Sequence, residues 1–230
     1  MRKNKNNLIL SWIKYNLVGW SIGILCGFFI VLCFEPLFKS VIKPILAGIF
    51  FWSPFGMAIG ITQQLKLKQW KFRANDWILA TTLGWFFSGT AFSFTYDYFV
   101  TQNNHTNIWA IIITAIIVML TGGVVIGGFQ SIVIRKTLSR IDVWILANAL
   151  GMLILGLIVL GTFFSLMPIF LKFFFEDGSF ILSFVSSLIS MLFFGIFTLY
   201  IPTGIILSKY GVKVAASNIS NGDSSKSNAG

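Results

Sequence analysis

Six uncharged polar side chains lie inside or directly beside otherwise apolar stretches of this 230-residue chain, and their amides and hydroxyls are the groups best placed to do chemistry there. They are Asn16, Gln63, Thr81, Gln130, Asn148 and Thr203. Each falls about one helical turn from the same end of its stretch, so the sequence predicts a single polar layer. Two interpretations stay open. The layer either ties neighbouring helices by hydrogen bonds of roughly 0.6–2 kcal/mol each, or it forms a vestibule that binds a neutral or anionic solute.

The groups that catalysis or metal binding would need are missing from these stretches. The single histidine, His105, falls in a connection with no cluster of acids or cysteines around it. No phosphate-binding loop, nucleophile motif or metal-ligand spacing occurs. Carboxylates occur only near the ends of the stretches, which argues against a proton-driven transporter. We therefore expect a protein that is not an enzyme and that uses no metal and no cofactor.

The composition excludes a soluble globular domain. Hydrophobic residues make up 56% of the chain and charged residues only 10%, against about 25% charged in soluble domains, and the mean hydropathy is +0.84. A helix needs about 20 apolar residues to cross a bilayer. Stretches of this kind cover residues 17–34, 45–65, 77–96, 109–132, 143–166 and 180–207. Because only helices satisfy their own backbone hydrogen bonds in lipid, the predicted fold is all-α, a polytopic membrane protein with six transmembrane helices.

The positive charges predict the orientation of these helices. The formal net charge is +10, but the 17 Lys and Arg are divided unequally between the two sides of the predicted membrane domain, and only a few lie on one side. Those few are Lys39, Lys43 and Lys172. The positive-inside rule then places both termini in the cytoplasm, and it places Trp12, Trp77 and Trp144 in an aromatic belt at the inner interface and Trp109 at the outer one. The basic clusters favour anionic lipid headgroups, and they form no extended face that would bind nucleic acid.

An internal repeat organises the chain. Residues 56–85 and 123–152 align without gaps at an offset of 67. The identical pairs include Gly56/Gly123, Gly60/Gly127, Gln63/Gln130, Arg73/Arg140 and Trp77/Trp144. Chance similarity between two apolar spans would seldom match residues of these types together, so we interpret the pattern as a duplication. A third copy is split between the two ends of the chain, because Trp12 and Trp20 match Trp77 and Trp85 at an offset of 65.

The repeat predicts a pseudo-threefold bundle of three helical hairpins whose axis lies along the membrane normal. Its units are residues 45–108, residues 109–178, and a split unit of residues 179–210 plus 1–44. Together they make a six-helix transmembrane domain over residues 1–210. Residues 211–230, rich in Ser, Asn and Gly, are expected to form a disordered cytoplasmic tail.

The repeated pattern also carries a resemblance. G-x3-G-x2-Q, a short basic connection and W-[IV]-L-A-x2-L-G-W, followed by a glycine-rich last span, resemble a group of multipass membrane proteins common in cyanobacteria and filamentous bacteria. The resemblance covers nearly all of residues 12–208. It implies a bacterial inner membrane or a thylakoid membrane as the location, and it implies no particular activity.

Glycines spaced four residues apart predict close approach of helices. They are Gly19, Gly23, Gly27, Gly56, Gly60, Gly123 and Gly127. Such faces let helix backbones meet closely in lipid, where packing drives association. The spacing suits helix packing within one chain, and it equally suits the interface of a homo-oligomer.

Two functions remain compatible with these features. The first is a non-enzymatic interaction, assembly or accessory protein of the bilayer, which binds lipid and a membrane-protein partner. The second is a small-solute or lipid permease that uses the polar layer, with Pro44, Pro54 and Pro202 as candidate kinks near its site. Short connections and the lack of charge inside the spans favour the first.

Overall fold

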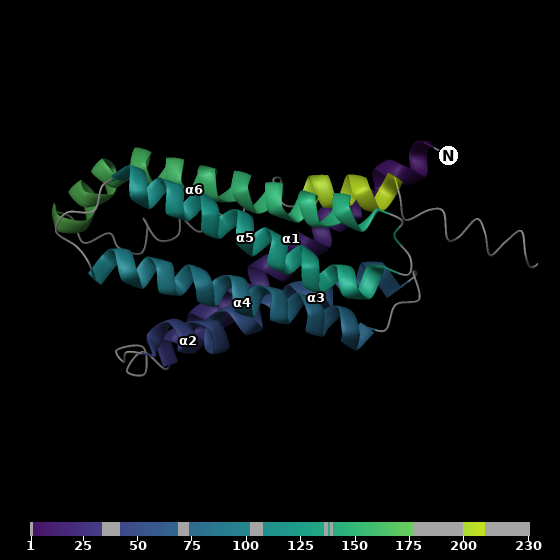
Figure 1. Ribbon diagram of the computed structural model, residues 1–230, viewed down its shortest axis with the longest axis horizontal. Helices are drawn as coiled ribbons and strands as arrows, with labels where there is room; N and C mark the ends of the chain where they lie inside the picture. Colours follow the sequence, from purple (N-terminus) through teal and green to yellow (C-terminus); the bar gives the residue numbers. More distant parts are fainter. Residues whose placement is uncertain are drawn as a thin grey trace, which may run out of the picture.

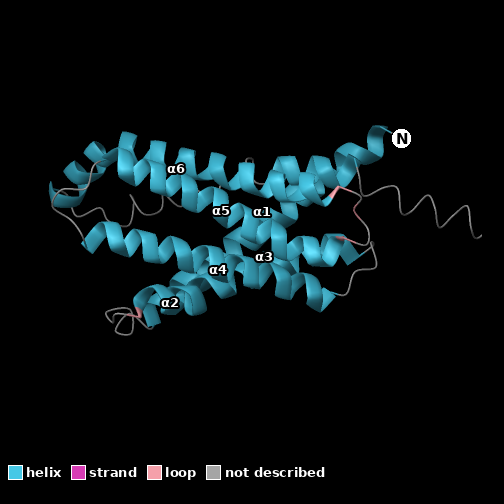
Figure 2. Ribbon diagram, viewed as in Figure 1, coloured by secondary structure: helices cyan, strands magenta, loops and turns pink. Residues whose placement is uncertain are grey.

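The computed structural model describes residues 2–33, 42–68, 74–101, 108–135, 138, 140–176 and 200–209, and the regular structure within these ranges is entirely helical (Figure 2). The helices are α1 (Arg2–Cys33), α2 (Lys43–Ala47), η2 (Gly48–Trp52), α3 (Ser53–Leu67), α4 (Ala74–Thr101), α5 (Ile108–Ile134) and α6 (Ile141–Glu176). A further helical segment covers residues 200–209. The all-α prediction is thus confirmed for the described part of the chain.

The helices form where the sequence is continuously apolar, and most of the predicted spans coincide with one of them. Four described segments are long and apolar enough to cross a membrane: Ile9–Gly27, Lys43–Leu67, Ile112–Ile134 and Ile141–Ile158. Helix α4 matches the predicted span at 77–96 but is not among the four, because hydroxyl side chains interrupt its apolar residues. Of the predicted span at 180–207, residues 180–199 lie outside the described residues.

Helices α2, η2 and α3 follow one another without a break, and η2 is a π-helical turn between the other two. Pro54 explains the wider turn, because proline has no backbone N–H to continue the α-helical pattern. The backbone N–H of Ser53 bonds the carbonyl of Gly48 instead, and the Ser53 hydroxyl donates to the same carbonyl at 3.0 Å. Pro44 lies in the first turn of α2, where its missing N–H removes no helical bond. Pro44 therefore lies at a helix start, whereas Pro54 lies within a continuous helical run, directly after its π-helical turn.

Neighbouring long helices pack side by side in chain order, α1 on α3, α3 on α4, α4 on α5 and α5 on α6. The segment 200–209 returns to α1, where Thr203 and Tyr200 accept hydrogen bonds from Trp12 and Trp20. Figure 1 shows the long helices running along one axis, with α1 crossing α3 and α4 at an angle and the yellow segment 200–209 at the end where α6 begins. The start of α1 and the ends of α3 and α5 lie at that same end.

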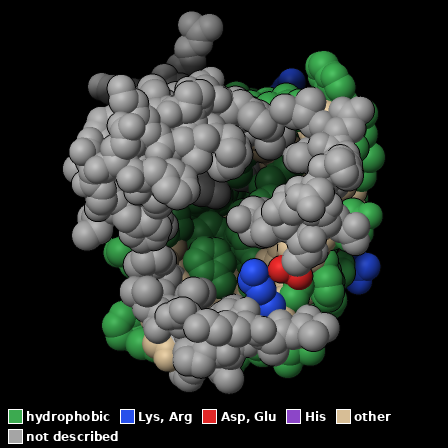
Figure 3. Space-filling model, turned by 90° about the vertical axis from the view of Figure 1, so that its left-hand side faces the viewer, with side chains coloured by type: hydrophobic (Ala, Val, Ile, Leu, Met, Phe, Trp, Pro, Cys, Tyr) green, Lys and Arg blue, Asp and Glu red, His purple; other side chains and the backbone are tan. Residues whose placement is uncertain are grey.

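The core is a continuous cluster of large side chains along the middle of the bundle, and tryptophans are prominent in it. Outside this core the helices expose apolar residues, such as Leu25, Phe29 and Trp109, which are 66–68% exposed. The opposite end of the bundle, seen in Figure 3, also presents mainly hydrophobic side chains among the described residues, with few charges. An apolar outer surface around an apolar core is typical of a helical bundle that sits in lipid.

Candidate functional site

The six polar residues of the predicted layer are all buried. Their exposed fractions range from 0% for Asn16 and Thr81 to 4% for Asn148. They come from six different helical segments: α1, α3, α4, α5, α6 and residues 200–209. Because polar groups buried in an apolar bundle need partners, what each of them bonds decides what the layer can do.

Gln63 lies at the centre of the best-connected part of this layer. Its Nε2 donates to Asn16 Oδ1 on α1 at 2.7 Å, and its Oε1 accepts from the indole Nε1 of Trp77 on α4 at 3.1 Å. A single side chain on α3 therefore joins three helices. Asn16 is aimed at Gln63 by its own Nδ2, which donates to the carbonyl of Trp12 one turn earlier at 2.8 Å.

Gln130, the equivalent of Gln63 at the offset of 67, is less completely bonded. Its Nε2 donates to Thr81 Oγ1 on α4 at 3.3 Å. Within the described part of the chain its Oε1 has no hydrogen-bond partner, and neither has the indole Nε1 of Trp144, the equivalent of Trp77. Asn148, like Asn16, donates from Nδ2 to the carbonyl one turn earlier, here that of Trp144, at 3.0 Å.

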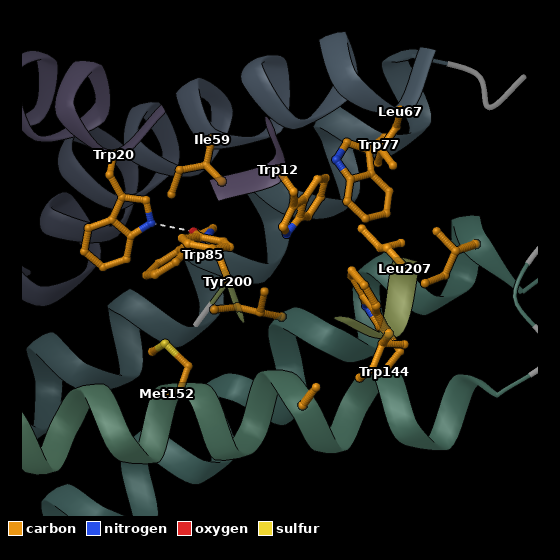
Figure 4. Close-up of a cluster of buried hydrophobic side chains, with 14 of the residues drawn as sticks. Trp12, Trp20, Ile59, Leu67, Trp77, Trp85, Trp144, Met152, Tyr200 and Leu207 are labelled. Carbon is orange, nitrogen blue, oxygen red and sulfur yellow. Dashed lines mark hydrogen bonds between the residues drawn. The ribbon is translucent and has the colours of Figure 1, made fainter. Parts of the chain in front are cut away.

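Thr203 brings the last described segment into contact with the first helix. The Trp12 indole donates to Thr203 Oγ1 at 3.1 Å, and the Trp20 indole donates to the Tyr200 hydroxyl (dashed in Figure 4). Thr203 thus takes the place beside Trp12 that Gln63 takes beside Trp77. The contact joins residues 191 positions apart in the sequence.

The tryptophans are the part of the site that the sequence analysis misplaced. Trp12, Trp77 and Trp144 were expected in an aromatic belt at the membrane interface, and this prediction is wrong. All three are at most 1% exposed, and Figure 4 shows them inside the bundle. The rings of Trp77 and Trp144 lie edge to face with centroids 6.2 Å apart. The sequence does contain a sign of this burial. Trp77 and Trp144 are aligned in the repeat, and each follows an aligned glutamine by 14 residues, whose amide an indole N–H can bond.

The seven predicted packing glycines lie against helices of the same chain. Gly19, Gly23 and Gly27 meet Ile59, Phe55 and Phe51; Gly56 and Gly60 meet Trp85 and Ile78; Gly123 and Gly127 meet Ala149 and Ile145. At most of them a Cβ atom would approach a neighbouring backbone atom to about 3 Å or less, so only glycine allows this close approach. These faces are filled by intramolecular contacts and leave no room for a second copy of the chain.

Two ion pairs of the described residues do not involve the polar layer. Lys43 and Asp97 form an ion pair of 3.3 Å between α2 and α4, and Arg140 bonds Asp142 at 2.7 Å at the start of α6. Within the described residues, no group of three or more His, Cys, Asp or Glu is placed to hold a metal ion. His105 and the tail at 211–230 lie outside the described residues. What the layer offers chemically is neutral hydrogen bonding.

Comparisons of the chain with protein-family models, with curated proteins and with solved structures find no match.

Proposed function

We propose that the protein is a non-enzymatic membrane protein that acts as an interaction, assembly or accessory subunit in the bilayer, and that its buried polar layer holds the bundle together. The observation that carries this proposal is the bonding of Gln63. Both ends of its amide are used within the chain, on Asn16 and on Trp77, and the residue is 2% exposed. A vestibule that received solutes would instead present such a group to water.

The outer surface supports the same proposal. The face of α5 turned away from α4 and α6 exposes Trp109, Ile113, Ile117 and Val124, which are spaced by one or two helical turns. Either lipid or the apolar face of a partner helix can cover such a face. A partner would therefore dock within the bilayer, since the connections between α3 and α4 and between α5 and α6 are only a few residues long.

The proposal includes the predicted architecture of six transmembrane helices in three hairpins with both termini in the cytoplasm. It is supported by the equivalent contacts of Gly60 and Gly127 and by the position of the start of α1 and of the ends of α3 and α5 at one end of the bundle. The same basic end would contact anionic lipids, and the resemblance of the repeat favours a bacterial inner or a thylakoid membrane.

Native mass spectrometry after purification in mild detergent at native expression tests the proposal. We expect a stoichiometric protein partner. Replacing Ile117 by Asp on the exposed face of α5 should remove that partner, whereas Asp at Ile61, exposed on α3, is the matched control for a charge in lipid. A partner-free protein that catalyses solute flux in vesicles would contradict the proposal.

A small-solute permease is the second candidate, and one observation favours it. Gln130 Oε1 and Trp144 Nε1 are buried without a partner, as expected of groups that a solute would bond. Reconstituted vesicles loaded with a neutral solute such as glycerol test this candidate. It requires flux that Gln130→Leu abolishes and that Gln63→Leu, in a folded protein, leaves intact.

A further inference from the structure

The α5–α6 hairpin holds one buried hydrogen-bond acceptor and one buried donor that bond nothing among the described residues. The acceptor is Gln130 Oε1, on a residue that is 2% exposed, and the donor is the indole Nε1 of Trp144, on a residue that is 1% exposed. A buried polar group without a partner costs about 1–3 kcal/mol, so two such groups of opposite kind in one hairpin need an explanation.

The backbones around these groups match the α3–α4 hairpin closely. A Cβ atom at Gly60 would lie 3.0 Å from the Cα of Ile78, and a Cβ atom at Gly127 would lie 3.0 Å from the Cα of Ile145. Gln63 and Gln130 each follow their glycine by three residues and so lie about one turn further along the same face. In the first hairpin this arrangement gives the bond from Trp77 to Gln63. The second hairpin has the same residue types at the aligned positions, Gln130 and Trp144, without the bond.

The difference originates on the neighbouring helix. Gln63 donates to Asn16, whose carboxamide oxygen reaches it at 2.7 Å. Gln130 donates to Thr81, which aligns with Asn16, and the distance there is 3.3 Å. A threonine hydroxyl lies nearer its own backbone than an asparagine carboxamide does, and Gln130, which bonds this hydroxyl at 3.3 Å, makes no bond with the Trp144 indole.

The chemistry of Gln130 Oε1 and Trp144 Nε1 determines which ligand could bind both atoms. A ligand must donate to a carbonyl oxygen and accept from an N–H, and a hydroxyl group does both. Ile126 and Ile134, one turn to either side of Gln130, are 2% and 1% exposed, so the surroundings are apolar and a charged ligand would have no counter-charge. We propose that Gln130 Oε1 and Trp144 Nε1 form a buried site for one neutral hydroxyl group, supplied by a water molecule or by a small alcohol. The site stands on these contacts alone and does not depend on either proposed function.

NMR of the indole N–H groups tests the site in the full chain in lipid nanodiscs. With the tryptophan nitrogens labelled, the indole resonance lost in Trp144→Phe assigns Trp144, and the one lost in Trp77→Phe assigns Trp77. We expect a cross-peak between water protons and the Trp144 indole N–H, and none at the Trp77 indole, which already bonds Gln63. If water is not the ligand, titration with ethylene glycol should shift the Trp144 indole resonance saturably and leave that of Trp77 in place.

Two reciprocal substitutions sharpen the test. Thr81→Asn gives Gln130 a longer side chain to bond on α4, so Gln130 should then reach Trp144. The water cross-peak or the alcohol-induced shift of the Trp144 indole N–H should therefore be lost. Asn16→Thr should open the first pair and create that signal at Trp77. The wild-type spectra decide the proposal even if either variant fails to fold. Neither a water cross-peak nor an alcohol shift at Trp144, or the same response at Trp77 and Trp144, would overturn it.

Discussion

In the hairpin of α3 and α4, Gln63 bonds both of its neighbouring helices, whereas in the hairpin of α5 and α6 the equivalent Gln130 bonds only α4. The contacts of Gly60 and Gly127 are nearly the same, because a Cβ atom at either position would lie 3.0 Å from the Cα of the facing residue, Ile78 or Ile145. Equal backbone packing therefore does not ensure equal hydrogen bonding. One residue on a third helix, Asn16 or Thr81, sets the difference.

The largest effect is expected where glycine contacts backbone most closely. A Cβ atom at Gly123 would lie 2.5 Å from both the Cα of Ala149 and the carbonyl oxygen of Asn148. Neither atom can move without shifting α6, so Gly123→Ala should lower the free energy of unfolding by about 3 kcal/mol or more. Reversible unfolding in mixed micelles of increasing SDS content measures this.

Gly128 is the matched control for this substitution. It lies on the same helix, and a Cβ atom there would meet nothing within 4 Å. Gly128→Ala should leave stability unchanged or raise it by up to about 1 kcal/mol, because alanine favours helix more than glycine. Equal losses for the two variants would contradict the packing that we describe.

The next effect separates the two glutamines. Gln63→Leu leaves Asn16 Oδ1 and Trp77 Nε1 without their partner and should cost about 1–3 kcal/mol. Gln130→Leu removes an acceptor that already lacks a partner and breaks only the 3.3 Å bond to Thr81, so it should cost less than about 1 kcal/mol. The same SDS titration compares them, and a larger loss for Gln130→Leu would refute the ranking.

The smallest effect is expected at the ion pair between Lys43 and Asp97. The two side chains are 44% and 34% exposed, so water weakens their attraction. Lys43→Met should cost less than about 1 kcal/mol. The thermal unfolding midpoint of this variant, measured at low and at high salt, should differ little from that of the wild type, and a loss as large as that of Gln63→Leu would count against the account.

The sequence predicts the helices and the polar residues of the layer well, because both follow from local rules. Long apolar runs must be helical in lipid, and Asn, Gln and Thr at the same depth of their spans were expected to be neighbours. The role of the tryptophans could not be predicted in this way. A tryptophan near the end of a span satisfies the rule for an interface residue, and only the angle between helices shows that Trp77 points inward to Gln63.

The unequal bonding of the two hairpins is likewise invisible in the sequence. The repeat pairs Gln63 with Gln130 and Trp77 with Trp144, and from identity alone the same bond would be expected twice. The two glutamines differ in the neighbour to which they donate, Asn16 at 2.7 Å and Thr81 at 3.3 Å. Such a distance is fixed by packing between helices that are separate in the chain.

The most direct test of the central claim, that the buried layer ties the bundle through the first hairpin, is a pair of double-mutant cycles. The first combines Gln63→Leu with Trp77→Phe, and the second combines Gln130→Leu with Trp144→Phe, with the free energy of unfolding measured for each variant. We predict a coupling of about 1 kcal/mol in the first cycle and of less than about 0.3 kcal/mol in the second. Equal coupling in the two cycles, or none in the first, would contradict the account.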